Sequence, residues 1–329
     1  MNTLGIHRSH NTHSPTYTQN GKLLHNLPTL TRIKSLAIPP AWRDVWINPS
    51  PTAPLQATGR DARGRKQYIY HPDWRASRER HKYRRILRFA TQLPHIRRRV
   101  RHDLKLKTPT LLKVQATIVS LLDRSLIRIG NPEYARQNRS YGLTTLRDSQ
   151  VSISAHKIAF HFRGKSKKIH DIELKDRKLA GIVRQCRDLP GEHLFQYLDE
   201  DGNRHKITSS DVNHYLRELS DAEFSAKDFR TWSATVLMIS ELLKTEPCTN
   251  ISATKRTLKA CLSSVAERLG NTPAICRKSY IHPIILKTYL SKNKLPSLKN
   301  TGPIPRGFTK PESTAFHLLT KLLRKRVKS

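Results

Sequence analysis

The chain has 329 residues, and 61 Lys and Arg against 25 Asp and Glu give it a formal net charge of +36. A hydrophobic content of 36% is enough for a core at this length, and two domains are expected. The positive excess favours a polyanionic partner, most simply nucleic acid. We find no apolar run of about 18 residues and no signal-peptide pattern, and the basic residues are spread along the chain, so a membrane partner is disfavoured.

Cysteine and histidine usage gives no sign of a metal site. The four cysteines are Cys186, Cys248, Cys261 and Cys276. They form no C-x-x-C pair, which disfavours a zinc ribbon or a disulfide framework and fits a reducing cytoplasm. Three histidines lie in residues 1–14, but a flexible polar arm is the simpler interpretation of that segment. We therefore expect no metal.

The next part of the chain predicts a small domain of mixed β and α structure over residues 15–100. "TYTQNGKLLHN" contains Asn20–Gly21, the strongest short hairpin signal. "QATGRDARGRKQYIYHP" predicts a turn and then a strand with Tyr68 and Tyr70 on one face. A basic helix is expected over 77–93, and the domain boundary somewhere between the prolines at positions 94 and 109.

"GRDARGRK", at residues 59–66, nearly spells a phosphate-binding P-loop. The motif needs Lys in the seventh position followed by Ser or Thr, whereas Arg65 and Lys66 stand there. The stretch also lies in an expected hairpin turn with no following helix. The sequence thus predicts no ATP site.

The second domain is expected to be larger and mainly helical, over residues 101–295. "LLKVQATIVSLLDRSLIRIG" and "TKRTLKACLSSVAERLG" both have helical spacing, and Gly270 is expected just past the end of the second helix. "VSISAHKIAFHFRGKSKKIHDIEL" predicts a three-stranded sheet. Residues 296–329 predict a polar linker and a basic amphipathic helix. The fold class is therefore α+β.

"GNTPAICRKSYIHP" places a tyrosine in an unusual position. Thr272 and Pro273 predict the start of a helix, and Pro283 keeps it short. Tyr280 is then expected near a frayed end, just after two basic residues, on a loosely held segment. From this stretch alone, an ordinary packed or surface tyrosine is the simpler interpretation, and a nucleophile is the alternative.

Several other stretches carry residues suited to phosphoryl transfer. The candidate set is Arg128 in "LIRIGNPEYARQN", Lys165 in "FRGKSKK", Arg230 in "KDFRTW", Asn271 and Tyr280. Together these blocks resemble the type IB DNA topoisomerases, in their poxvirus and bacterial form. The resemblance runs from about Tyr17 to the tyrosine block and also includes "LAIPPAWRDVWI", "GRDARGRKQYIYHPDW" and "HLFQYLDEDG" in the same order.

The resemblance implies a role for each of the five residues. Tyr280 matches the nucleophile, Arg128 and Arg230 match the two catalytic arginines, and Lys165 matches the lysine of the β-turn. Asn271 stands where viral and nuclear relatives have His; it can still donate a hydrogen bond but cannot transfer a proton. The implied reaction relaxes supercoiled duplex DNA through transient cleavage of one strand and a 3′-phosphotyrosyl link.

The chemistry explains why these residue types occur together. Forming a phenolate at neutral pH costs roughly 4 kcal/mol for a tyrosine with a pKa of about 10. Arginines can meet the charge that develops on the phosphate oxygens, and a lysine can protonate the leaving 5′-oxygen. One phosphodiester replaces another, so neither ATP nor a metal is expected.

Two other functions remain open from the sequence. A tyrosine recombinase shares the design of the catalytic domain, but recombinases usually carry H-x-x-R, whereas Lys227 stands three residues before Arg230. They also use a helical N-terminal domain, and this one carries hairpin signals. A basic DNA-binding protein without catalysis is the third possibility. It would leave the arginines as phosphate contacts, Lys165 as a solvated turn residue and Asn271 as a helix cap.

The resemblance also implies contacts to DNA outside the chemistry. The candidates are Gln67, Tyr68, Tyr70, Tyr134, Arg136 and Lys227. A glutamine side chain can form two hydrogen bonds with an adenine base, and a tyrosine hydroxyl can reach a phosphate. A half-buried position on the face of a sheet would explain Tyr70 equally well. We expect a monomer that closes as a C-shaped clamp around duplex DNA, with no small-molecule cofactor and no membrane partner, in the cytoplasm at the nucleoid.

Overall fold

The structure is a computed structural model that describes residues 5–9, 15–220, 222–296 and 304–327. The chain divides into two compact units, residues 1–84 and 85–329. Both contain helices and strands, and the larger is mainly helical, so the α+β class is confirmed.

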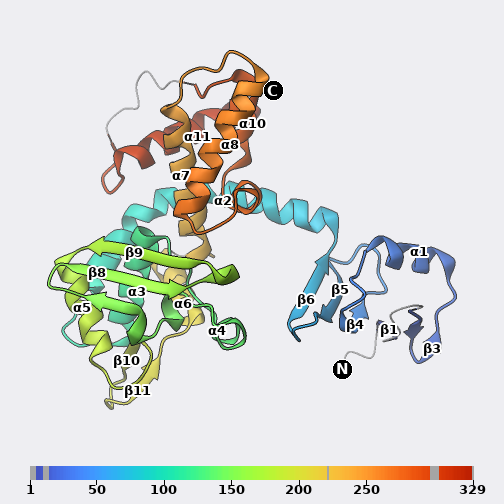
Figure 1. Ribbon diagram of the computed structural model, residues 1–329, viewed down its shortest axis with the longest axis horizontal. Coiled ribbons are helices and arrows are strands. Elements are labelled where there is room, and N and C mark those ends of the chain that lie inside the picture. Colours follow the sequence, from blue (N-terminus) through green and yellow to red (C-terminus); the bar gives the residue numbers. More distant parts are fainter. Residues whose placement is uncertain (1–4, 10–14, 221, 297–303, 328–329) are drawn as a thin grey trace. The chain divides into compact units, whose positions relative to one another are not determined.

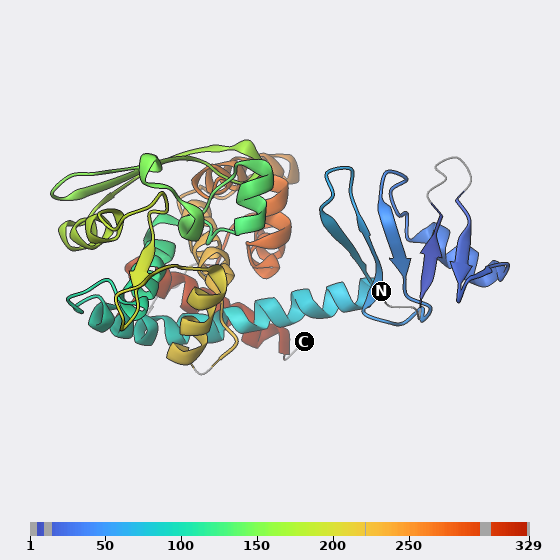
Figure 2. The ribbon, with the colours of Figure 1, turned by 90° about the horizontal axis from the view of Figure 1, so that it is seen from below.

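The first unit is built on one antiparallel sheet with strand order β3-β2-β1-β4-β5-β6 (Figure 2). Its strands are β1 Ile6–Arg8, β2 Tyr17–Gln19, β3 Lys22–Leu23, β4 Arg43–Ile47, β5 Leu55–Arg60 and β6 Lys66–Tyr70. Helix α1, Leu27–Ser35, contributes Ile33 to a small core with Ile6, Val45 and Ile47 of the sheet.

Two turns of this sheet follow the sequence prediction. Asn20 and Gly21 have φ of 53° and 77°, so they form the expected hairpin turn between β2 and β3. In the turn between β5 and β6, the Asp61 carboxylate accepts hydrogen bonds from the backbone N–H groups of Arg63 and Arg65, both at 3.0 Å. The side chain of Asp61 thus occupies backbone donors that a phosphate-binding loop would offer to its ligand.

The prediction of a flexible arm over residues 1–14 is wrong for residues 5–9. Strand β1 pairs with β2 and β4, and its Ile6 is fully buried. Gly5 allows close packing, because a Cβ there would lie 1.9 Å from Nε1 of Trp46. A strand of three residues is too short to show the alternation by which strands are recognised. The remainder of the expected arm lies outside the described residues.

Helix α2, Pro72–Asp103, is longer than expected, and Pro94 lies inside it. The boundary between the units falls within this helix, after Arg84, and not between positions 94 and 109. A proline inside a helix removes one backbone hydrogen bond, but the neighbouring Leu93 and Ile96 are fully buried. Packing of this apolar face therefore maintains the helix through the proline.

The sheet of the second unit confirms the three-stranded prediction. Its antiparallel strands are β7 Val151–Ile153, β8 Lys157–Arg163 and β9 Ile169–Lys175. Helices α3, Leu111–Ser125, and α5, Arg177–Arg187, pack against this sheet (Figure 1). A two-stranded sheet, β10 Gln196–Leu198 and β11 Arg204–Lys206, lies next to α3 and α5.

The remaining helices complete the second unit. They are α4 Pro132–Asn138, α6 Ser209–Ser220, α7 Ala226–Leu243, α8 Ile251–Arg268, α9 Pro273–Ser279, α10 Pro283–Lys292 and α11 Lys310–Val327. Helix α11 packs on α7 and α10, and its Leu318 and Leu319 are fully buried. The basic helix expected in residues 296–329 is present, but it belongs to the core of this unit and is not a separate tail.

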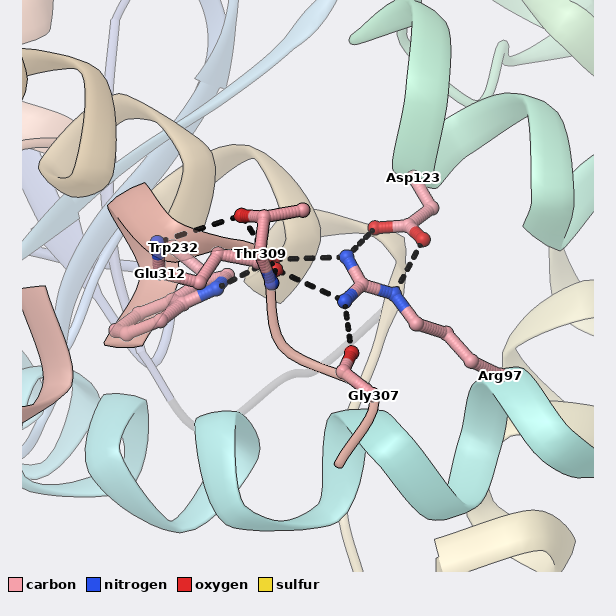
Figure 3. Close-up of polar contacts among 6 residues, drawn as sticks. All are labelled: Arg97, Asp123, Trp232, Gly307, Thr309 and Glu312. Carbon is pink, nitrogen blue, oxygen red and sulfur yellow. Dashed lines mark hydrogen bonds and ion pairs between the residues drawn. The ribbon is translucent and has the colours of Figure 1, made fainter. Parts of the chain in front are cut away.

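A buried polar network fixes the start of α11 (Figure 3). The Arg97 guanidinium of α2 forms ion pairs with Asp123 of α3 at 2.7 Å and with Glu312 at 2.8 Å. The Glu312 carboxylate also accepts hydrogen bonds from the Trp232 indole at 3.3 Å and from the Thr309 backbone N–H at 2.8 Å. This network connects α11 with α7, which also carries Arg230.

We expect Arg97→Ala to destabilise the second unit by about 3–5 kcal/mol, because two largely buried carboxylates lose their common partner. Urea denaturation followed by far-UV circular dichroism measures this loss. Arg98→Ala is the matched control, because Arg98 is an exposed neighbour on the same helix. Equal stabilities of the two variants would refute a stabilising role for the network.

Candidate active site

Arg128 lies in a tightly packed loop after α3. The helix ends at Leu126, which has a left-handed φ of 59°. The Arg128 carbonyl accepts a hydrogen bond from the Leu143 N–H at 2.9 Å, and a Cβ on Gly142 would lie 2.5 Å from the same oxygen. Glycine at position 142 therefore allows the approach that holds the Arg128 backbone.

Arg230 lies in the first turns of α7 and is 3% exposed. Asp228 starts this helix by accepting a hydrogen bond from the Ser225 N–H at 2.9 Å, and Arg85 holds the Asp228 carboxylate at 2.8 Å. The Arg230 guanidinium donates to the carbonyl of Leu126 and, at 2.7 Å, to that of Leu269. It therefore connects the ends of α3 and α8.

Asn271 follows the Schellman motif that ends α8. Gly270, with φ of +60°, donates its N–H to the Glu267 carbonyl at 2.9 Å, and the Asn271 N–H bonds the Ala266 carbonyl at 2.8 Å. The predicted role of Gly270 at the end of this helix is confirmed.

Tyr280 is the C-cap residue of α9 and is only 6% exposed. Thr272 caps the start of this helix, as predicted, by accepting a hydrogen bond from the Ile275 N–H at 3.3 Å. The expectation that Tyr280 lies on a loosely held, frayed segment is wrong. Its N–H bonds the Cys276 carbonyl at 3.1 Å, and its carbonyl accepts a hydrogen bond from the Thr235 hydroxyl at 3.3 Å.

Four of the five predicted catalytic residues form one cluster. Nη1 of Arg128 donates a hydrogen bond to the Tyr280 hydroxyl at 2.8 Å, and Nη2 of the same side chain donates to Oδ1 of Asn271. The guanidinium carbon of Arg230 lies 5.2 Å from the centroid of the Tyr280 ring. Two cations thus face one phenol.

The charges around Tyr280 favour its ionised form. Burial alone raises the pKa of the phenol, but the positive charges of Arg128 and Arg230 and their hydrogen bonds outweigh it, and the net pKa is lowered. The Nε atoms of both arginines are buried and have no hydrogen-bond partner among the residues that the structure describes. A buried donor of this kind is costly unless a ligand accepts from it, and phosphate oxygens are suitable acceptors.

Tyr280 should therefore ionise below the ordinary tyrosine pKa of about 10 in the free protein. The difference in tyrosinate absorbance between the wild type and Tyr280→Phe, titrated with base, reports this group. When both proteins also carry Arg128→Ala, the pH midpoint of this absorbance difference should be higher, because one of the two cations beside Tyr280 is lost. Arg98→Ala should leave the midpoint unchanged, and a wild-type midpoint above the ordinary value would contradict the electrostatic argument.

Lys165 is not part of the cluster in this structure. It is exposed in the turn between β8 and β9, and within the described residues no hydrogen bond joins it to Tyr280 or to either arginine. The same turn reaches the site through Lys168, whose Nζ lies 3.4 Å from the Asn271 carbonyl oxygen. Sequence reasoning missed Lys168 and also His170, although both lie in the "FRGKSKKIH" block that it singled out.

The candidate DNA contacts of the first unit gather on β6. Gln67 donates to the Asp61 carboxylate at 2.9 Å, and Tyr68 is 47% exposed. The Tyr70 ring stacks on Trp74 with centroids 4.3 Å apart, which is the packing role that the sequence left open for it. In the second unit Tyr134 and Arg136 lie on α4, and Lys227 is exposed in the first turn of α7.

Two further classes of site find no support in the described part of the chain. No group of three or more His, Cys, Asp or Glu side chains within it is arranged to hold a metal ion. Likewise, no helix within it is both long and apolar enough to span a membrane.

A buried tyrosine held between two arginines, in a chain of net charge +36, indicates the class of proteins that bind the phosphates of nucleic acids. Comparison with known proteins narrows this class. Residues 71–299 match the family described as eukaryotic DNA topoisomerase I, catalytic core, and residues 16–61 match the bacterial DNA topoisomerase IB N-terminal domain.

Individual relatives agree with this assignment. The chain is 33% identical to DNA topoisomerase 1B of Acanthamoeba polyphaga mimivirus over 267 residues, which are 79% of this chain and 80% of the relative. It is 24% identical to DNA topoisomerase 1B of Vaccinia virus (strain Copenhagen) over 74% of this chain and 75% of the relative. The chain belongs to the type IB DNA topoisomerases.

Proposed function

We propose that Tyr280 is the nucleophile with which this topoisomerase relaxes supercoiled duplex DNA. Its phenolate oxygen bonds to a backbone phosphorus, and the bond from that phosphorus to the 5′-oxygen breaks. The products are a 3′-phosphotyrosyl link and a free 5′-hydroxyl end, which rotates under superhelical tension. Attack by the 5′-hydroxyl then restores the strand and releases Tyr280.

Two arginines and an asparagine stabilise the transition state in this proposal. The hydrogen bond of 2.8 Å between Arg128 Nη1 and the Tyr280 hydroxyl is the observation that supports it most directly. Arg128 and Arg230 would offer further donors to the non-bridging oxygens, where negative charge develops. Asn271 would donate through its side-chain amide.

Proton transfer completes the proposed reaction. Lys165 supplies a proton to the leaving 5′-oxygen and recovers it on religation. Tyr280 loses its own proton to solvent, which its lowered pKa favours. The bond energy is retained in the phosphotyrosyl link, so we propose a reaction without ATP or metal, carried out by a monomer in the cytoplasm.

The two units would divide the binding of duplex DNA between them. Gln67, Tyr68 and Tyr70 are the proposed contacts from the first unit, and Tyr134, Arg136 and Lys227 those from the second. The net charge of +36 supports a partner with a dense negative charge.

Plasmid relaxation tests this function directly. We expect the protein to relax both positively and negatively supercoiled plasmid in EDTA and without ATP. Rapid denaturation during the reaction should trap protein on the 3′ side of the break. An absolute requirement for a metal or a nucleotide, or adducts on the 5′ side, would refute the proposed mechanism.

A further inference from the structure

The His170 side chain occupies an unusual position beside the active site. His170 lies on β9 opposite Phe162 of β8, and the two rings stack with centroids 5.0 Å apart and an interplanar angle of 9°. The imidazole is therefore held by an aromatic neighbour within its own hairpin. No described residue forms a hydrogen bond with its ring nitrogens.

The same ring lies against two glycines from distant parts of the chain. A Cβ on Gly164 would lie 2.6 Å from Cδ2 of His170, and a Cβ on Gly270 would lie 2.2 Å from Cε1. Both separations are below any real contact of a Cβ, so the ring fills the space that the glycines leave. Gly164 directly precedes Lys165, and Gly270 directly precedes Asn271.

A second contact joins the same two segments. Nζ of Lys168 donates to the Asn271 carbonyl at 3.4 Å, and the Gly164 N–H bonds the Lys168 carbonyl at 2.7 Å. The base of the lysine turn is thus connected with the Gly270–Asn271 segment by a hydrogen bond and by the imidazole. Ser166 and Lys167, at the tip, have φ of 62° and 63°, so the tip itself is under backbone strain and depends on its base for support.

We infer that His170 is a positioning residue that seats the Lys165 turn against the Gly270–Asn271 segment. The inference rests on the proposed role of Lys165 as the proton donor to the leaving oxygen. His170 does not touch the reacting atoms in this account. It acts through Lys165, by fixing the base of the turn that carries it.

The charge state of His170 agrees with a packing role. Burial, followed by the positive charges of Arg230, Arg128 and Lys168, lowers the pKa of the imidazole. The ring therefore stays neutral at neutral pH and fits among the three cations without adding a fourth. Because Phe162 packs on the face of the imidazole and the two glycines lie against its ring atoms, another aromatic ring can take its place.

Two substitutions at His170 test whether the residue acts on the protonation of the leaving 5′-oxygen. In single-turnover cleavage of an ordinary duplex, His170→Ala should be slowed about 10²-fold, as expected for a displaced catalytic group. A substrate with a 5′-bridging sulfur needs no proton on its leaving atom, so it should restore most of the rate. His170→Phe keeps a ring against both glycines and should remain within about threefold of the wild type on the ordinary duplex.

Gly164→Ala provides an independent test of the same contact. Its added Cβ would collide with the imidazole in the wild type, but in the His170→Ala background the next atom is a Phe162 carbon at an ordinary 3.6 Å. Gly164→Ala should therefore slow cleavage in the wild type and have little further effect in His170→Ala. Additive losses in this double-mutant cycle would contradict the inference.

The outcomes separate this inference from the proposed function. If Lys165→Ala is rescued by sulfur but His170→Ala has no defect, or has the same defect on both substrates, the inference fails and the function of Lys165 stands. A loss in His170→Phe as large as that in His170→Ala would also overturn it. If sulfur fails to rescue Lys165→Ala itself, the proposed proton donor is wrong.

Discussion

Tyr280→Phe is expected to abolish strand cleavage while leaving the fold and non-covalent DNA binding near normal. The substitution removes one oxygen and keeps the ring that packs between Arg128 and Arg230. The rate should fall below detection, a loss of at least about 10⁶-fold, because the proposed mechanism assigns the attack on phosphorus to Tyr280 alone. Single-turnover cleavage of a labelled duplex, with denaturing gels to reveal the covalent adduct, measures this loss.

A second buried tyrosine gives the matched control. Tyr289 of α10 is fully buried, and its hydroxyl lies 3.2 Å from the Thr245 hydroxyl, so Tyr289→Phe removes a comparable buried oxygen. We expect this variant to cleave DNA at nearly the wild-type rate. Residual relaxation by Tyr280→Phe would return Tyr280 to the role of an ordinary packed tyrosine.

The sequence predicted the elements whose signals are local. Asn20–Gly21 predicted a hairpin turn, Thr272 and Pro273 predicted the start of a helix, and Gly270 predicted the end of a helix. The structure has all three features. Each of these features depends on a few adjacent residues with restricted backbone angles or a capping oxygen. Local chemistry of this kind is readable without knowledge of the tertiary structure.

The wrong predictions concern features that tertiary packing decides. Pro94 suggested a boundary, but the buried face of α2 continues through it. The sequence predicted a loose arm over residues 1–14, but Ile6 lies in the sheet and the core. The sequence predicted a loosely held Tyr280, but both its backbone N–H and its carbonyl form hydrogen bonds. The strand partners of Ile6 and the Thr235 hydroxyl that bonds the Tyr280 carbonyl are distant in the sequence, so local patterns do not reveal them.

The candidate site shows the same division. The five residue types could be named from motifs, but their mutual arrangement could not. The double contact of Arg128 with Tyr280 and Asn271 joins positions 152 and 143 residues apart. His170 had no sequence signal of its own, because its contact with Gly270, far along the chain, depends on the absence of a Cβ there.

Lys165→Ala is expected to slow cleavage of an ordinary duplex by about 10²- to 10⁴-fold, the usual contribution of a positioned general acid. A duplex with sulfur at the bridging 5′ position should largely restore the rate, because a thiolate, whose conjugate acid has a pKa of about 8.5, leaves without a proton. Lys167→Ala is the matched control, because Lys167 is exposed in the same turn, and it should cleave both substrates like the wild type.

The arginine variants should behave differently from Lys165→Ala. Arg128→Ala and Arg230→Ala lose donors to the phosphate, worth about 3–4 kcal/mol each, and this charge develops whichever atom leaves. Sulfur should therefore rescue neither of them. Equal rescue of all three variants would mean that they act on one common step, and the assignment of the proton to Lys165 would be wrong.

Religation provides a check on the same assignment from the opposite direction. The two steps pass through the same transition state, so the group that protonates the leaving 5′-oxygen must accept the proton when the 5′-hydroxyl attacks. Lys165→Ala should thus slow religation of a preformed phosphotyrosyl complex by a factor similar to its effect on cleavage. The equilibrium between intact DNA and the covalent complex would then change little. A variant that slows cleavage alone would instead shift this equilibrium toward intact DNA. Quenched-flow measurement of the cleavage and religation rates separates the two cases.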